Sequence, residues 1–459
     1  MRRFARENAL CAFIAGAGCG AMAWLGLYGF AWSDYEIEAL PAFSALAHGH
    51  LLEFLRLAPA YGGSLVERAP FALLPGLWGG GDLAVYRMVA LPCLLASAAL
   101  GVWLVARMRS EGRSTLARAV ALGLCVANPL TLSALEFGHP EELLGACLCV
   151  AAVLLAARGR PLWAGALLGL AIANKEWALL AAGPVLLVLP PRRRLPCLAS
   201  AGAIAAAVLG PLVAVGSGGF VAGTRALAVG PGVIFQPWQV WWFLGSPNHV
   251  PASIGAGRAI PVGAPLSTHP GWRLPPSWLP DVTHPLILAV GLGLAVALWL
   301  RRRRRTGTGT VGERDALLAL ALVLLLRCLL DTWDAIYYPL PFVLALLAWE
   351  VRGSTRRPPV LALSSSLLAW ISFQWLPSHA SPDTQAAFFL AWSLPLAATL
   401  GVLLYGPSRS GVGGRSPMAW RARGREATVG ALDGLVRTSW PSPAPTVKPS
   451  IRAPRWPSR

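Results

Sequence analysis

Long apolar runs alternate with short polar segments along residues 1–405. The first run, 10–31, is long enough to cross a bilayer, because about 20 helical residues at roughly 1.5 Å each span the hydrocarbon core. Runs of similar character follow up to residue 405, and two of them are short. The pattern predicts an all-α polytopic membrane domain over 1–405, with about 12 transmembrane or re-entrant helices.

Arginine clusters between the runs set the expected orientation. Loops rich in Lys and Arg are retained in the cytoplasm, and here the clusters fall after every second run. This rule predicts that both termini are cytoplasmic and that the loops at 32–82 and 216–283 lie on the outer side. The clusters used are Arg2, Arg3 and Arg6; Arg107 to Arg118; Arg158 and Arg160; Arg192 to Arg194; Arg301 to Arg305; and Arg352 to Arg357.

The stretch 161–190 fits this alternation only as two short helices. A single crossing would place Arg192 to Arg194 outside, against the charge rule. We therefore expect helices over 162–173 and 177–189, with Lys175 in the tip of a hairpin on the outer side. Non-helical backbone is tolerated at such a depth if protein buries it or a cavity wets it.

Composition agrees with a membrane protein. Of 459 residues, 55% are hydrophobic and 13% charged, and the mean hydropathy is +0.56. The formal net charge of +18 comes from short clusters between apolar runs, so we expect no nucleic-acid partner. Residues 406–459 are rich in Arg, Pro, Ser and Gly, and predict a disordered basic cytoplasmic tail.

An acidic cluster follows the first run directly. Asp34, Glu36 and Glu38 lie within five positions and, by the charge rule, on the outer side. The next stretch, 39–46, has apolar residues at helical spacing and is expected to lie in the plane of the membrane interface. Asp34 is therefore a candidate catalytic carboxylate, although an ordinary solvated loop residue has the same sequence signature.

Other charged residues gather at the expected outer ends of runs. Lys175 could meet a phosphate or pair with Glu176 or another carboxylate. Arg327, Asp331 and Asp334 follow at helical spacing and should share a face, either as a structural pair or as a lipid-phosphate site.

Two more segments have an ordinary and a functional interpretation. His139 precedes Pro140 and two glutamates, a pattern that is also typical of a helix start. Trp238 and Trp241 belong to an aromatic belt or to a surface on which a sugar ring stacks.

Several of these segments together resemble the C-type membrane glycosyltransferases, and most closely glycosyltransferase family 87 of bacteria. The resemblance covers most of residues 32–350. It depends on the order of segments that are weak individually. These are Ser33-Asp34-Tyr35 with Ala45-Leu46-Ala47-His48-Gly49-His50, Asn128-Pro129 before Gly138-His139-Pro140, Ala164 to Ala171 before Lys175, and Tyr337-Tyr338-Pro339. The loop has one Asp with glutamates where the family has a paired Asp-Asp.

The resemblance implies an enzyme of the cell membrane and envelope, a hexosyl- or pentosyltransferase with an extracytoplasmic active-site cavity. It would transfer a sugar from a polyprenyl-phosphate donor to a lipid-linked or polysaccharide acceptor. Asp34 would be the general base, supported by acidic Glu36, Asp331 and Asp334. Lys175, Arg327, Arg68 and His139 would bind the donor phosphate, and Trp238 and Trp241 would stack on sugar. We expect no bound metal or other cofactor, while leaving open a divalent ion held by Asp34 and Glu36.

Two other functional classes remain open from the sequence. A secondary transporter or lipid flippase would carry polar residues near the bilayer midplane and usually repeated halves, whereas the charges here gather toward one side. A non-catalytic membrane protein of envelope assembly would tolerate replacement of Asp34 by Asn.

Overall fold

The computed structural model describes most of the chain up to residue 406. The described residues are 2–28, 34–216, 218–222, 235–247, 250–251, 268–269, 273–353 and 357–406. The tail predicted at 406–459 lies outside them from residue 407 onward, as does much of the outer segment predicted at 216–283.

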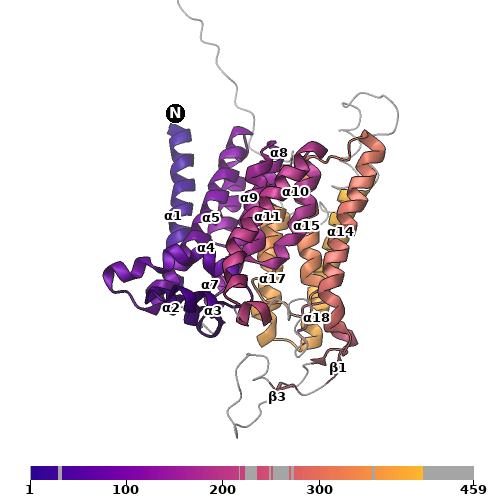
Figure 1. The fold of residues 1–459 in the computed structure, drawn as a ribbon. Helices are drawn as coiled ribbons and strands as arrows, with labels where there is room; N and C mark the ends of the chain where they lie inside the picture. Colours follow the sequence, from indigo (N-terminus) through magenta and orange to yellow (C-terminus); the bar gives the residue numbers. More distant parts are fainter. Residues whose placement is uncertain are drawn as a thin grey trace, which may run out of the picture. The chain divides into compact units, whose positions relative to one another are not determined.

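The described part is a bundle of helices (Figure 1). Its longer helices are α1 (Arg2–Tyr28), α5 (Asp82–Ser110), α6 (Thr115–Val126), α7 (Pro129–Phe137), α8 (Glu141–Ala157), α9 (Pro161–Asn174), α11 (Pro191–Ala214), α14 (Leu279–Thr306), α15 (Glu313–Leu330), α16 (Pro339–Val351), α17 (Val360–Trp370) and α18 (Pro382–Tyr405).

Short elements connect these helices. The α-helices among them are α2 (Leu40–Ala47), α3 (Leu51–Arg56), α4 (Gly62–Ala72) and α10 (Ala182–Val188). The 3₁₀ and π turns are η1 (Tyr35–Ala39), η2 (Leu74–Trp78), η3 (Glu176–Ala181), η4 (Trp242–Leu244), η5 (Ile371–Trp375) and η6 (Leu376–Ser378). Two antiparallel pairs of two-residue strands join β1 (Ser246–Pro247) to β4 (Arg273–Leu274), and β2 (Val250–Pro251) to β3 (Thr268–His269).

Six helices of the described part are long and apolar enough to cross a membrane, which agrees with the predicted all-α membrane protein. They are Asp82–Ser110, Thr115–Phe137, Pro191–Ala214, Leu279–Thr306, Val360–Ser378 and Pro382–Tyr405. Shorter apolar helices accompany them, among them α9, α10 and α16. Helix α16 is apolar on every side and buried from Pro339 to Trp349, so it forms the centre of the bundle, packed between α8, α15 and α17.

The chain breaks at Lys175, as the charge pattern required. Helix α9 ends at Asn174 and Lys175 is extended, with φ −154° and ψ 134°. Gly165 and Gly169 of α9 lie against the carbonyl oxygens of Cys197 and Ala201 of α11, so the two helices run in the same direction. Segment η3–α10 therefore brings the chain back before α11 begins, and α10 packs on α8, α14 and α15.

The apolar residues of 39–46 are buried against other parts of the protein, whereas we expected them to face the membrane interface. Within α2, Phe43 is fully buried and Leu46 nearly so, and they pack with Tyr35, Leu65 and other apolar residues in a second core. Its apolar face was read correctly as one side of a helix, but α4 and α5 cover that side instead of lipid.

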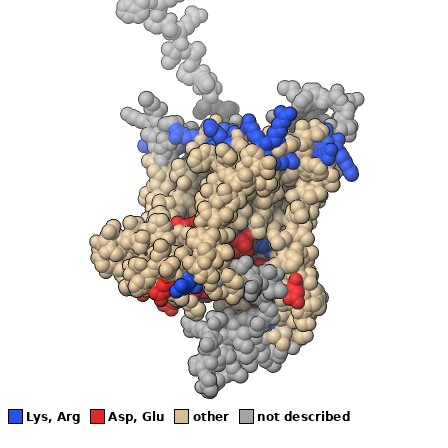
Figure 2. Space-filling model, viewed as in Figure 1, with Lys and Arg blue, Asp and Glu red and all other residues tan. Residues whose placement is uncertain are grey.

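Arginines gather at the end of the bundle where α1 begins (Figure 2). There the Arg113 guanidinium donates to the Val351 carbonyl at 3.0 Å, and Arg193 donates to the Gly159 carbonyl at 2.8 Å. Arg301 donates to the Leu404 carbonyl at 3.3 Å. Since these contacts join loops that are far apart in sequence, the arginine clusters share one end. Their position on the cytoplasmic side stays a prediction.

Close packing of α9 on α11 makes a first prediction. A Cβ atom at Gly169 would overlap the Ala201 carbonyl oxygen and lie 3.0 Å from the Cβ of Ile204, whereas one at Gly202 would meet nothing within 4 Å. We expect Gly169→Leu to cost about 1–3 kcal/mol of stability, because overpacking forces the helices apart. Thermal unfolding of the purified protein, with Gly202→Leu as the control, measures this. Equal midpoints for the two variants would refute the close contact.

Candidate functional site

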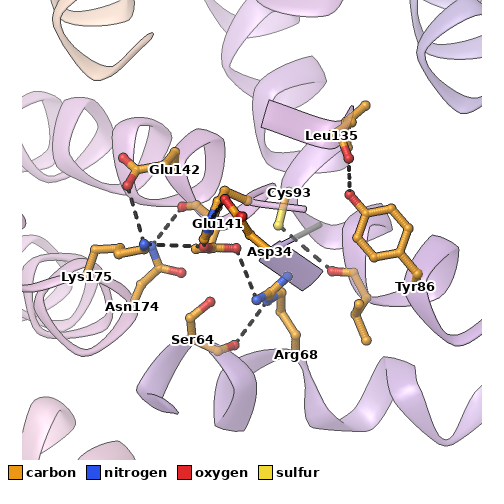
Figure 3. A network of polar contacts seen from close by, with 12 residues as sticks. Asp34, Ser64, Arg68, Tyr86, Cys93, Leu135, Glu141, Glu142, Asn174 and Lys175 are labelled. Atoms are coloured by element: carbon orange, nitrogen blue, oxygen red, sulfur yellow. Dashed lines mark hydrogen bonds and ion pairs between the residues drawn. The ribbon is translucent and has the colours of Figure 1, made fainter. Parts of the chain in front are cut away.

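Polar side chains from distant parts of the chain meet in the described bundle (Figure 3). Asp34 directly precedes η1, Arg68 lies in α4, and Glu141 and Glu142 form the first turn of α8. Lys175 lies in the break between α9 and η3. Hydrogen bonds and ion pairs connect them in one network.

Local sequence places His139 between two helices. Gly138 ends α7 in the left-handed region, with φ 92°, which favours glycine. A Cβ atom there would lie 2.8 Å from the Tyr35 backbone nitrogen, so glycine also permits close approach of the segment that carries Asp34. Pro140 then precedes α8. The turn therefore holds His139 against the beginning of η1.

His139 bridges two carboxylates. Its Nε2 lies 3.2 Å from Asp34 Oδ2, and its Nδ1 lies 2.7 Å from Glu141 Oε1. A neutral imidazole has only one N–H to donate, so donation to both carboxylates requires the imidazolium form. Burial lowers the pKa of His139, but the Glu141 charge and the hydrogen bonds that His139 donates to Asp34 and Glu141 outweigh burial and raise that pKa to about 9.

Glu141 joins most of the network. Its fully buried carboxylate accepts a hydrogen bond from Arg68 Nη2 at 3.2 Å and lies 3.4 Å from Lys175 Nζ. Its backbone carbonyl accepts from Asn174 Nδ2 at 2.8 Å, which fixes the end of α9 beside α8. A buried carboxylate needs such partners, because an isolated charge in this environment would cost several kcal/mol.

Glu142 lies between two cations, Lys175 and Arg327. Its Oε1 lies 3.5 Å from Lys175 Nζ, and its Oε2 lies 3.9 Å from Arg327 Nη1. At 3.9 Å, Glu142 Oε2 and Arg327 Nη1 form an ion pair but are too far apart for a hydrogen bond. Each of these two atoms is buried without a hydrogen-bond partner. Arg327 Nη1 and Glu142 Oε2 thus each have an unused position for a hydrogen bond.

Aromatic rings line the cations. Lys175 Nζ lies 4.3 Å from the centre of the Tyr61 ring. The Arg327 guanidinium lies 4.3 Å from the Tyr338 ring and 5.1 Å from the Trp177 ring. Such cation–π contacts hold a buried positive charge without neutralising it.

The structure brings together five of the residues singled out from sequence: Asp34, His139, Arg68, Lys175 and Arg327. Glu36 is not among them, because its side chain is exposed while Asp34 bonds His139. In the described residues no group of three or more His, Cys, Asp or Glu side chains is arranged to hold a metal ion.

The shared face expected for Arg327, Asp331 and Asp334 is wrong. Helix α15 ends at Leu330, and Asp331 is extended, so helical spacing does not continue past it. The Asp331 carboxylate lies 3.3 Å from His284 Nε2, and the ion pair of Arg327 is with Glu142. Asp334 is fully buried, and burial raises the pKa of its carboxyl well above the usual range.

The two tryptophans singled out for sugar stacking have contacts elsewhere. The Trp238 indole N–H donates to the Ser372 carbonyl at 2.9 Å, and its ring packs on Phe373. The Trp241 indole N–H donates to the Leu330 carbonyl at 2.8 Å. Both tie the segment after residue 235 to α15 and η5, so a role in binding sugar has no support from these contacts.

Sequence reasoning missed the central role of Glu141 and Glu142. In the sequence they have the pattern of acidic residues at a helix start, which they also are. The available signal was their position, since two adjacent carboxylates begin an apolar helix that is buried on most sides. The aromatic partners Tyr61 and Trp177 had no sequence signal, whereas Tyr338 belongs to the segment Tyr337-Tyr338-Pro339 used for the resemblance.

Residues 79–191 match the model of the MptA_B family, described as alpha-(1->6)-mannopyranosyltransferase, N-terminal domain. The matched part is well under half of the chain and includes His139, Glu141, Glu142 and Lys175. Together with the apolar helices, it supports a membrane glycosyltransferase. No curated protein matches the chain.

The network makes a prediction about stability. Glu141→Gln removes the negative charge that faces Arg68, Lys175 and His139, and leaves those cations buried. We expect a loss of about 3–5 kcal/mol, as for other buried ion pairs that lose one partner. Thermal unfolding of the purified variant measures it, and Glu36→Gln, at an exposed position, should unfold like the wild type. An unchanged midpoint for Glu141→Gln would show that this charge is not needed.

Proposed function

We propose that the protein is a mannosyltransferase of the cell membrane that uses a polyprenyl-phosphate-linked donor and a glycan or lipid acceptor. One observation carries the proposal. Asp34 is the one partly open member of the Asp34–His139–Glu141 series, with its side chain 34% exposed against 6% and 0% for the other two. A carboxylate held from behind by a buried imidazolium can accept a proton on its open side.

In the proposed reaction Asp34 removes the proton from an acceptor hydroxyl. The hydroxyl oxygen bonds to the anomeric carbon of the donor sugar as the bond from that carbon to the phosphate oxygen breaks. Polyprenyl phosphate leaves with the bonding electrons, and the proton stays on Asp34. His139 does not touch the substrate in this scheme, and Glu141 fixes its ring so that Asp34 keeps one orientation.

The cations of the network favour an anionic donor. Arg68, Lys175, Arg327 and the His139 imidazolium meet the carboxylates of Asp34, Glu141 and Glu142. The Arg327–Glu142 pair, at 3.9 Å, is the longest of these contacts. A sugar–phosphate–lipid diester carries one negative charge, so its phosphate would complete the network near Lys175 and Arg327.

The finer assignments belong to the same proposal. We infer a family 87-like enzyme of the C-type class, with about 12 transmembrane or re-entrant helices. Its substrate cavity would open on the outer side of the cell membrane, and both termini would be cytoplasmic. Support comes from the arginines at the end of the bundle where α1 begins and from α2, which lies at the opposite end (Figure 1).

Transfer assays test Asp34. We expect Asp34→Asn to lower kcat by at least about 10²-fold, because general-base catalysis contributes a factor of roughly 10² to 10⁴. The assay uses protein reconstituted in lipid, polyprenyl-phosphate mannose radiolabelled in the sugar, and membrane extract as acceptor. Glu36→Gln is the matched control, since this neighbouring carboxylate lies outside the network.

Three results would count against this assignment. Equal transfer by Asp34→Asn and wild type would eliminate Asp34 as the base. Transfer only from another polyprenyl-phosphate sugar would exclude mannose. A complete lack of transfer from any such donor would favour a transporter or an assembly protein.

The phosphate site has a separate test. Arg327→Gln should raise the KM for the lipid donor about tenfold or more while affecting the KM for the acceptor little, because a charge-assisted contact to phosphate contributes about 1.5–3 kcal/mol. Initial rates at varied donor and acceptor concentrations measure both constants. An increase confined to the acceptor KM would move Arg327 to the acceptor side.

The pH dependence follows from His139. Its pKa of about 9 lies above the unperturbed value, so the ring is protonated at neutral pH. It loses this proton as the pH rises through about 9. We expect kcat/KM to fall over that range and His139→Gln to be weakly active without the same fall. A wild-type profile that stays flat to pH 10 would contradict a charged His139.

A further inference from the structure

The turn η2 presents large apolar side chains outward. Leu77 is 81% exposed, Trp78 58% and Leu73 49%, while Ala72 and Pro75 on the inner side are buried. A loop in water would normally place polar groups at such outward positions, and a contiguous exposed apolar patch marks an interaction surface.

The place of η2 in the chain identifies what covers this surface. Gly79, with φ 73°, turns the chain after Trp78, and α5 begins at Asp82. Helix α5 is a candidate membrane span of 29 residues, hence about 44 Å long, against about 30 Å for the hydrocarbon core. The helix is therefore longer than the hydrocarbon core requires, and the charged Asp82 in its first turn favours the level of the lipid headgroups for that end.

We propose that η2 lies in the membrane interface, with Leu77 directed to the acyl chains and Trp78 at headgroup level. The occupant of the apolar surface is the bilayer that α5 already crosses, and the exposed Leu95 and Val102 of α5 continue the apolar surface further along that helix. Tryptophan is enriched at this depth because its ring is apolar and its N–H is polar.

Such an anchor would set the depth of the polar network. Helix α4 leads through Leu73 directly into η2, and α4 carries Arg68, whose guanidinium pairs with Glu141. Holding η2 in the interface therefore holds Arg68 at a constant distance from the headgroups. The membrane contact itself does not depend on the proposed function.

Site-specific photo-crosslinking tests the contact. Full-length protein carrying benzoylphenylalanine in place of Leu77 or Trp78 is reconstituted in vesicles of phosphatidylethanolamine and phosphatidylglycerol. After irradiation, mass spectrometry counts protein–lipid adducts. The same amino acid in place of Ala47, an exposed residue at the end of α2, is the matched control.

We expect lipid adducts at 77 and 78 in several-fold excess over those at 47. Adduct yields at 77 no higher than at 47 would overturn the proposal. A crosslinked dimer in place of the lipid adduct would assign the surface to a second copy of the chain and also overturn it. Thermal midpoints equal to that of the wild type verify that each labelled variant is folded.

Discussion

The buried carboxylate of Glu141 is the interaction on which the rest of the site depends. It connects α8 to Arg68 of α4, to Lys175 after α9 and, through His139, to Asp34 before η1. Helix packing alone would allow these segments to slide, because apolar side chains fit together in many registers. Charge-assisted hydrogen bonds have strict distances and directions, so they fix the positions at which the four segments meet.

This arrangement trades stability for position. Burying a charge costs free energy that its partners recover only if the geometry is good, and apolar side chains of equal volume often give a more stable core. The ion pair between Glu142 and Arg327, at 3.9 Å, is looser than the contacts of Glu141. The network thus has shorter contacts around Glu141 and a longer one between Glu142 and Arg327, which is where we propose that the donor phosphate binds.

The sequence predicted helices better than contacts. Apolar runs gave the membrane helices and the break at Lys175, because hydrophobicity and charge position act locally. The prediction for 39–46 was wrong because an apolar helical face has the same pattern whether lipid or protein covers it. The shared helix face predicted for Arg327, Asp331 and Asp334 was wrong because α15 ends at Leu330, before Asp331. The position of Glu141 depends on tertiary contacts that no local pattern records.

Asp34 is more exposed to solvent than its partners His139 and Glu141, and this difference limits where a substrate could react. Electrostatic interactions are stronger away from water, so the buried cations near Glu141 and Glu142 have their largest effect on a charge brought close to them. Asp34 alone of the Asp34–His139–Glu141 series reaches a partly open surface. In the proposed reaction, a substrate that meets both would place its reacting carbon between the open face of Asp34 and the cations around Glu142. A lipid-linked sugar has this layout, with a polar head that enters the protein and an apolar tail that remains in the membrane.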